Sequence, residues 1–221
     1  MATFVLIHGG GDVGWYWHLV GRELRRRGHD TLAPDLPCDD DSAGLAEYAD
    51  TVVKAIGGRR GLIVAAQSLG GFTAPLVAAR VPVDMLVLVA GMIPAPGEAP
   101  EDWPANTGFD GVMRQQAQRY SGQDLIYHDV PPALAEQARR NAREQSDTPG
   151  HAAWPLEAWP SVPTRFVLCT EDRLFPPEFM RRVVADRMDV VPDEIAAGHA
   201  VALSRPKELA NLLVSYTATG G

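Results

Sequence analysis

A serine among small residues is the first feature of this sequence that could do chemistry. Ser68 stands in the segment Ala66-Gln67-Ser68-Leu69-Gly70, between an apolar run and a stretch of helical period. Small residues two positions before and after a serine allow the sharp strand-to-helix turn that exposes its hydroxyl as a nucleophile. The pattern departs from G-x-S-x-G only at Ala66, and taken alone it is equally typical of an ordinary turn.

A second segment could stabilise a negative charge beside that serine. His8-Gly9-Gly10-Gly11 follows the first apolar run of the chain. Glycine-rich loops of this kind supply backbone amides to an oxyanion hole, together with the amide of the residue after the nucleophile. We therefore expect the amides of Gly10 and Leu69 to form such a hole, and we expect His8 to hold the loop in place.

An acid and a base follow Ser68 in the chain order that serine nucleophiles at such turns use. Asp172 comes just after the apolar run 164–170, and His199 lies after the run that ends at residue 195. His199 could take the serine proton, while a buried Asp172 would orient the imidazole. Two alternatives stay open: Glu171 could be the acid instead, with Asp172 capping the helix at 177, and His199 could be a plain loop histidine.

The hydrophobic pattern predicts the elements that bring these residues together. Six short apolar runs predict strands, and five stretches of helical period lie between or after them, each long enough to cross over between parallel strands. The expected strands are Thr3–His8, Thr31–Pro34, Gly61–Gln67, Asp84–Ala90, Thr164–Thr170 and Asp189–Ile195, and the expected helices are Tyr16–Arg27, Ala43–Ile56, Leu69–Arg80, Pro177–Arg187 and Val201–Tyr216. This order predicts an α/β fold with a doubly wound, mostly parallel six-stranded sheet and functional residues at the carboxyl ends of its strands.

One interruption of the alternation predicts a helical cap. Residues 92–160 are rich in proline and show helical period near 112–119 and 132–145, so we expect residues 1–91 and 161–221 to form the core. The insertion is rich in aromatic residues, and a lid of this kind would suit an apolar or aromatic substrate. The same aromatic side chains could equally serve only to pack the cap against the core. The residues expected to line the substrate pocket are Gly11, Trp15, Trp17, Trp103, Tyr127 and Trp154. We expect the neighbouring His128 and Asp129 to form a turn or to cap the helix after Pro131.

Composition excludes several other classes of function. The 221 residues carry a net charge of −8 and no basic run longer than Arg25-Arg26-Arg27, so nucleic acids and anionic membranes are not expected partners. The chain starts without a signal-like leader and has no apolar run of bilayer length, which predicts a cytoplasmic protein. Cys38 and Cys169 show no paired spacing, so neither a disulfide nor a metal site is expected. Nothing in the sequence indicates the oligomeric state.

Four motifs together resemble the α/β-hydrolase superfamily: IHGGG, AQSLGG, CTEDRLFP and AAGHAVALSRPKEL. The first thirty or so residues are similar to the small branch that contains plant methylesterases and hydroxynitrile lyases. The resemblance implies an α/β-hydrolase fold, no cofactor, Ser68 as nucleophile, Asp172 as acid, His199 as base, and an oxyanion hole at Gly10 and Leu69. In that branch the lyases carry a lysine and a threonine where this chain has Ala200 and Gly9, so the resemblance favours hydrolysis.

We therefore expect a serine hydrolase that cleaves a small carboxylic ester or thioester through an acyl-enzyme. Two alternatives remain open at this point. The triad could act on a different electrophile, as in hydroxynitrile-lyase-like or carbon–carbon bond hydrolase chemistry. The protein could also be a ligand-binding receptor that keeps the fold without turnover.

Overall fold

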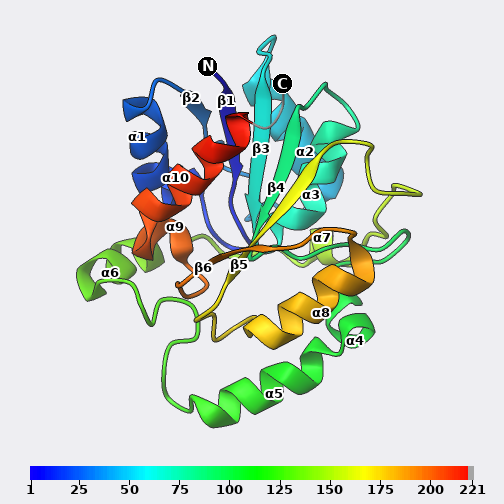
Figure 1. Ribbon diagram of the computed structural model, residues 1–221. Coiled ribbons are helices and arrows are strands. Elements are labelled where there is room, and N and C mark those ends of the chain that lie inside the picture. Colours follow the sequence, from blue (N-terminus) through cyan, green and yellow to red (C-terminus); the bar gives the residue numbers. More distant parts are fainter. Residues whose placement is uncertain (219–221) are drawn as a thin grey trace.

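The computed structural model describes residues 1–218 and contains one six-stranded sheet (Figure 1). The strands are β1 (Thr3–Ile7), β2 (Asp30–Leu32), β3 (Leu62–Gln67), β4 (Met85–Val89), β5 (Thr164–Cys169) and β6 (Asp193–Ile195). They lie in the order β2-β1-β3-β4-β5-β6, and every neighbouring pair is parallel. The sheet reverses its winding beside β1, as expected for a doubly wound fold.

Helices cover both faces of this sheet. The helices after β1 and β2 are η1 (Gly14–Trp17), α1 (His18–Arg26) and α2 (Leu45–Ile56), and α3 (Gly70–Ala78) follows β3. The segment between β4 and β5 holds α4 (Trp103–Thr107), α5 (Phe109–Arg119), α6 (Pro132–Asn141) and α7 (Thr148–His151). The chain ends with α8 (Pro177–Arg187), α9 (Val201–Ser204), α10 (Pro206–Ser215) and η2 (Tyr216–Ala218). In Figure 1, α1 and α10 lie on one side of the sheet and α2 and α3 on the other.

Alternation along the strands separates two hydrophobic clusters. Val5 and Ile7 of β1 pack into the cluster that includes apolar residues of α2, α3 and α8. Phe4 and Leu6 point to the opposite face and pack with α1, α9 and α10. All four side chains have no exposed surface. Because both faces are buried, the strand is apolar throughout rather than alternately polar.

The predicted fold class is confirmed, and the main differences from the expected elements concern two helices and the last strand. The expected helix Val201–Tyr216 is interrupted at Arg205, the residue before Pro206, because a residue before proline avoids the helical conformation. The expected helix from Tyr16 begins instead as the 3-10 turn η1 and becomes α-helical at His18. The last strand is also shorter than expected, since only Asp193–Ile195 pairs with β5.

The segment between β4 and β5 contacts the core through an aromatic cluster. Trp103 of α4 and Phe109 of α5 pack against Phe175 and Phe179, with ring centroids 5.0–5.8 Å apart. These rings place α4 and α5 beside α8, as Figure 1 shows. Among residues 1–218, no helix is both long and apolar enough to cross a membrane.

Candidate active site

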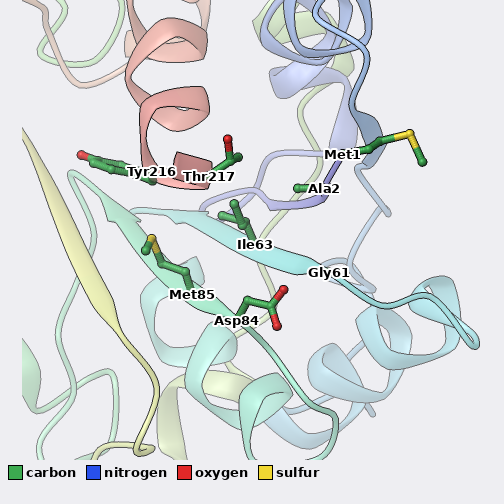
Figure 2. Close-up of a pocket in the computed structure, with 8 residues that line it drawn as sticks. All are labelled: Met1, Ala2, Gly61, Ile63, Asp84, Met85, Tyr216 and Thr217. Carbon is green, nitrogen blue, oxygen red and sulfur yellow. The ribbon is translucent and has the colours of Figure 1, made fainter. Parts of the chain in front are cut away.

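A cavity of about 300 Å³ lies at the carboxyl ends of the strands, where a parallel sheet of this type places its ligand site. Its lining comes from the loops after β1, β4, β5 and β6, the turn after β3, and the insertion, and consists of Gly9, Gly10, Asp12, Tyr16, Gln67, Ser68, Leu69, Met92, Ile126, Tyr127, Leu174, His199 and Ala200. A second cavity, of about 200 Å³, lies at the opposite edge beside the amino ends of β1, β3 and β4 (Figure 2). None of its labelled side chains is a serine, cysteine or histidine, so the first cavity is the candidate site.

The turn that carries Ser68 is strained in the manner of a nucleophile elbow. Ser68 has φ of +49°, a left-handed conformation that non-glycine residues rarely adopt. A side chain at Gly71 would collide with the carbonyl group of Met92, so the helix approaches the neighbouring loop closely there. Ala66 stands in the sheet between Ile7 and Leu88 with no exposed surface, so its methyl group is accommodated without breaking the strand.

Asp172 and His199 form a buried hydrogen-bonded pair beside this turn. His199 Nδ1 lies 2.7 Å from Asp172 Oδ2, and the two residues are 3% and 4% exposed. The other carboxylate oxygen of Asp172 accepts the backbone N–H groups of Leu174 and Phe175 at 2.8 and 2.9 Å. Glu171, the alternative acid, is exposed. A carboxylate held in this way orients the imidazole with its proton on Nδ1 and its lone pair on Nε2.

The imidazole lone pair is occupied by a residue that the sequence analysis did not single out. Gln67 Nε2 lies 2.9 Å from His199 Nε2, and the glutamine is 4% exposed. Within residues 1–218 the Ser68 hydroxyl has no hydrogen-bond partner, although Ser68 and His199 line the same cavity. The amide of Gln67 therefore competes with Ser68 for the atom that would serve as the base. The position directly before the nucleophile is the only sequence signal that could have suggested this role.

The glycine loop after β1 is held in place by His8, and its residue Gly10 lines the cavity. His8 is buried, with Nδ1 2.8 Å from the Gly9 carbonyl oxygen, while Nε2 accepts the Leu36 N–H at 3.0 Å. Burial lowers the pKa of His8, which suits a neutral structural side chain. Among the described residues the Gly10 and Leu69 amides donate to no protein acceptor, and both residues line the cavity. Free amides in this position can receive an oxyanion.

The structure places most of the predicted pocket residues away from the cavity, and Tyr127 is the exception. The indoles of Trp103 and Trp154 are buried in the core and donate to the carbonyl oxygens of Ile93 and Phe72, each at 3.1 Å. These two rings attach the insertion to the core, because a buried indole is stable where its N–H finds an acceptor.

The other predicted pocket residues of the first loop also face elsewhere. Trp17 is fully buried in the cluster between the sheet and α1, and Trp15 stacks on His18 with ring centroids 4.3 Å apart. The Gly11 amide donates to Gln145 Oε1 at 2.9 Å, which links the loop to the insertion. The expectation of an indole-lined pocket is therefore corrected for these tryptophans and for Gly11.

His128 and Asp129 connect the insertion to the two loops that carry Asp172 and His199. Asp129 Oδ2 accepts the Gly198 N–H at 2.8 Å, and His128 Nε2 lies 3.1 Å from the carbonyl oxygen of Glu171. A side chain at Gly198 would collide with both residues. The expected turn is confirmed, since His128 and Asp129 lie in a turn closed by the Val130 N–H and the Tyr127 carbonyl oxygen at 3.0 Å, whereas α6 begins after Pro131 without a side-chain cap.

Acidic and phenolic groups give one wall of the cavity a polar character that the sequence analysis missed. Burial raises the pKa of Asp12 to about 6 and the pKa of Tyr127 to about 12. Tyr16, also buried, has a pKa well above its usual range for the same reason. Within residues 1–218 no three or more histidine, cysteine or carboxylate side chains lie together in a way that could hold a metal ion.

The fold and the site define a protein of the α/β-hydrolase class. Residues 4–212 match the model of the alpha/beta hydrolase family, and the chain therefore belongs to that family. It is 24% identical to norfluorocurarine synthase 1 from a Strychnos species over 248 residues, covering 95% of this chain and 93% of the relative. It is 24% identical to polyneuridine aldehyde esterase from Rauvolfia serpentina over 259 residues, covering 97% and 95%.

Solved structures show the same fold over nearly the whole chain. The crystal structure of polyneuridine aldehyde esterase superposes with a TM-score of 0.81 at 22% identity, covering 98% of this chain and 99% of that one. A pyrethroid hydrolase from Sphingobium faniae gives a TM-score of 0.78 at 20% identity, covering 98% and 97%. The resemblance to the plant methylesterase branch, first noted in the motifs, is thus shared by sequence and fold.

Proposed function

We propose that the protein is a serine hydrolase that cleaves a small carboxylic ester or thioester through an acyl-enzyme. The observation that carries the proposal is the convergence at one cavity of strained Ser68, the hydrogen-bonded pair of His199 and Asp172, and the free amides of Gly10 and Leu69. Membership of the alpha/beta hydrolase family supports hydrolysis. The names of two similar proteins, an esterase and a pyrethroid hydrolase, support an ester as the substrate.

The proposed reaction has two halves. The Ser68 oxygen bonds to the carbonyl carbon while its proton passes to His199 Nε2, and Asp172 stabilises the imidazolium. The amides of Gly10 and Leu69 receive the oxyanion, and the bond to the leaving oxygen or sulfur breaks as that atom takes the proton from His199. Water then repeats the sequence on the acyl-enzyme, releasing the acid and restoring Ser68. Gln67 has to give up its hydrogen bond to Nε2 before either half can start.

Gly9 and Ala200 support hydrolysis over cyanohydrin cleavage. Both residues line the cavity, and neither supplies a cation or a hydroxyl. Any side chain at position 9 would collide with Gln67 and Ser68, so a threonine there is incompatible with the observed position of Gln67. A departing cyanide would find no lysine at position 200.

Steady-state hydrolysis of p-nitrophenyl acetate, p-nitrophenyl butyrate and matching thioesters tests the proposal. Ser68→Ala and His199→Ala are expected to lose activity by about 10⁶-fold and Asp172→Asn by about 10⁴-fold. Ser204→Ala, which removes a hydroxyl without a hydrogen-bond partner among residues 1–218, is the matched control and should keep full activity. A folded wild-type protein that turns over no ester or thioester, or a Ser68→Ala variant as active as wild type, would contradict the proposal. Mandelonitrile cleavage faster than ester turnover would favour the lyase alternative instead.

A further inference from the structure

An unneutralised carboxyl group stands in the wall of the cavity. Asp12 follows Gly11, whose φ of +64° turns the chain after the glycine loop, and Asp12 Oδ1 accepts the Val13 N–H at 2.8 Å. Within residues 1–218 it forms no ion pair with a lysine, arginine or histidine. Arg143, the cation nearest to this loop in the hydrogen-bond network, is paired with Asp35 and Asp39. The Asp12 carboxyl therefore has no positive partner in the part of the chain that the structure describes.

Two phenols line the same cavity near this carboxyl group. Tyr16 is 2% exposed, and its hydroxyl has no hydrogen-bond partner among the described residues. The backbone of Ala202 lies close enough to lower the pKa of this phenol without forming a hydrogen bond of ordinary geometry. Asp12, Tyr16 and Tyr127 all line this cavity, and the charge on Asp12 raises the pKa of each phenol. We call Asp12, Tyr16 and Tyr127 the anionic pole of the cavity.

The state of these groups at neutral pH determines what they can bind. Burial brings the pKa of Asp12 to about 6, with Asp35 adding a like-charge repulsion, so the carboxyl is mostly ionised at neutral pH and both phenols are neutral. Asp12 is half-buried, and an apolar substrate packed against it would remove the remaining water from a carboxylate that has no cation to replace it, which is costly. A cationic group on the substrate would instead supply the missing charge, and the rings of two tyrosines are favourable neighbours for it.

We propose that the anionic pole binds a protonated amine, so that the preferred substrates are esters or thioesters carrying an ammonium group on the part that lies against Asp12. This proposal rests on the proposed hydrolase function, because it assigns the substrate class of the same cavity. It replaces the expectation of a purely apolar or aromatic substrate, while Met92, Ile126 and Leu174 still provide an apolar wall.

Two esters of the same shape test the proposal through turnover. 2-(Dimethylamino)ethyl acetate is cationic at neutral pH, and 3-methylbutyl acetate is its uncharged counterpart with carbon in place of nitrogen. The ratio of their kcat/KM values should favour the amine by about 10- to 100-fold in the wild type, the range for a hydrogen bond to a charged group. Asp12→Asn keeps an acceptor for the Val13 N–H and should bring the ratio close to 1. Both kcat/KM values are measured on one preparation, so a lower fraction of folded variant reduces both equally and leaves their ratio unchanged.

Asp110→Asn is the matched control for the change in net charge, since Asp110 is exposed on α5, away from the cavity, and this variant should keep the wild-type ratio. A wild-type ratio of 1 or below would overturn the proposal. An unchanged ratio in Asp12→Asn would also overturn it. An equal loss of activity on both esters in Asp12→Asn would overturn it too, because the carboxyl would then have a catalytic or purely structural role.

A binding measurement separates this proposal from the proposed hydrolysis. Calorimetry with Ser68→Ala compares the two esters as unreacted ligands, so it needs no turnover. The amine ester should bind more tightly than its uncharged counterpart, and this preference should be lost in the double variant Ser68→Ala/Asp12→Asn. That result would support the anionic pole even if the wild type hydrolysed neither ester. In that case only the proposed hydrolase function would fail. Equal binding of the two esters would overturn the anionic pole whatever the protein hydrolyses.

Discussion

Replacing Gln67 by methionine should make the protein a faster hydrolase. The Gln67 amide lies 2.9 Å from His199 Nε2, the atom that accepts the Ser68 proton in the proposed reaction. An imidazole nitrogen has one lone pair, so this hydrogen bond has to break before the serine can be deprotonated. Methionine has a similar unbranched shape and no N–H to donate, so it should fill the same buried space while leaving Nε2 free for Ser68.

The size of the effect follows from the cost of that one hydrogen bond. A hydrogen bond between neutral groups contributes about 0.5–1.5 kcal/mol net, which corresponds to about a 2- to 13-fold change in rate. Gln67→Met should therefore raise kcat/KM for p-nitrophenyl butyrate by a factor in this range. Gln67→Glu should lower it below wild type, because a carboxylate at this position favours the protonated imidazole, which has no lone pair left for the serine.

Stopped-flow or plate-reader kinetics on purified variants can resolve changes of this size. Gln116→Met makes the same chemical change at a buried glutamine of α5 that does not line the cavity, and it should leave kcat/KM unaltered. The reasoning is refuted if Gln67→Met is folded and loses activity by ten-fold or more. In that case Gln67 would hold His199 in its productive orientation rather than restrain it.

Three further outcomes follow from the same geometry. Asp129→Ala removes the acceptor of the Gly198 N–H, a contact with a charged group that is typically worth about 1.5–3 kcal/mol, and should lower kcat by about 10- to 100-fold with little change in KM. Asp129→Asn keeps an acceptor and should recover most of that loss, and equal kinetics in the two variants would rule out a positioning role. Asp12→Asn should raise the free energy of unfolding at about pH 8 by up to about 3 kcal/mol and leave it unchanged near pH 3, as measured by urea denaturation. The sign follows because the pKa of Asp12 rises from 3.8 to about 6 on folding, so the stability linked to this group is complete below 3.8 and is lost as the pH rises through 6. Gly71→Ala should lower the free energy of unfolding by about 1–3 kcal/mol, because its methyl group would collide with the Met92 carbonyl, whereas Gly58→Ala has open space and should not.

The fold could be predicted closely because its signals are local and repeated. The apolar runs of β1, β3, β4 and β5 are buried on both faces, and their observed ends lie within a residue of the predicted ones. The predicted helix Pro177–Arg187 has the observed bounds. Errors occur where proline interrupts an apolar pattern, as at Pro206, because periodicity describes one face of a helix and not its continuity.

The positions of Ser68, Asp172 and His199 were predictable for a topological reason. Each stands just after a strand, and the carboxyl ends of parallel strands meet at one edge of the sheet. The partner of His199 Nε2 was not predictable, because Gln67 is 132 residues away in the sequence and no spacing rule connects the two side chains. The same holds for Asp129, whose partner at Gly198 is 69 residues away in the sequence.

The prediction that tryptophans line the substrate pocket was wrong for an energetic reason. Trp103 and Trp154 gain more from burial with a carbonyl acceptor than from facing a cavity, and sequence alone does not show which of these two environments a ring will find. The acidic wall was missed because Asp12 follows a glycine-rich loop, where a single carboxylate is indistinguishable from an exposed turn residue.

Active-site labelling of Ser68 is the most direct measurement of whether this serine is an activated nucleophile. A fluorophosphonate probe followed by intact mass and peptide mapping should show one adduct on Ser68, absent in Ser68→Ala and formed much more slowly in His199→Ala. A folded wild-type protein that stays unmodified, or an adduct on any other residue, would contradict the assignment of Ser68 and His199 as nucleophile and base.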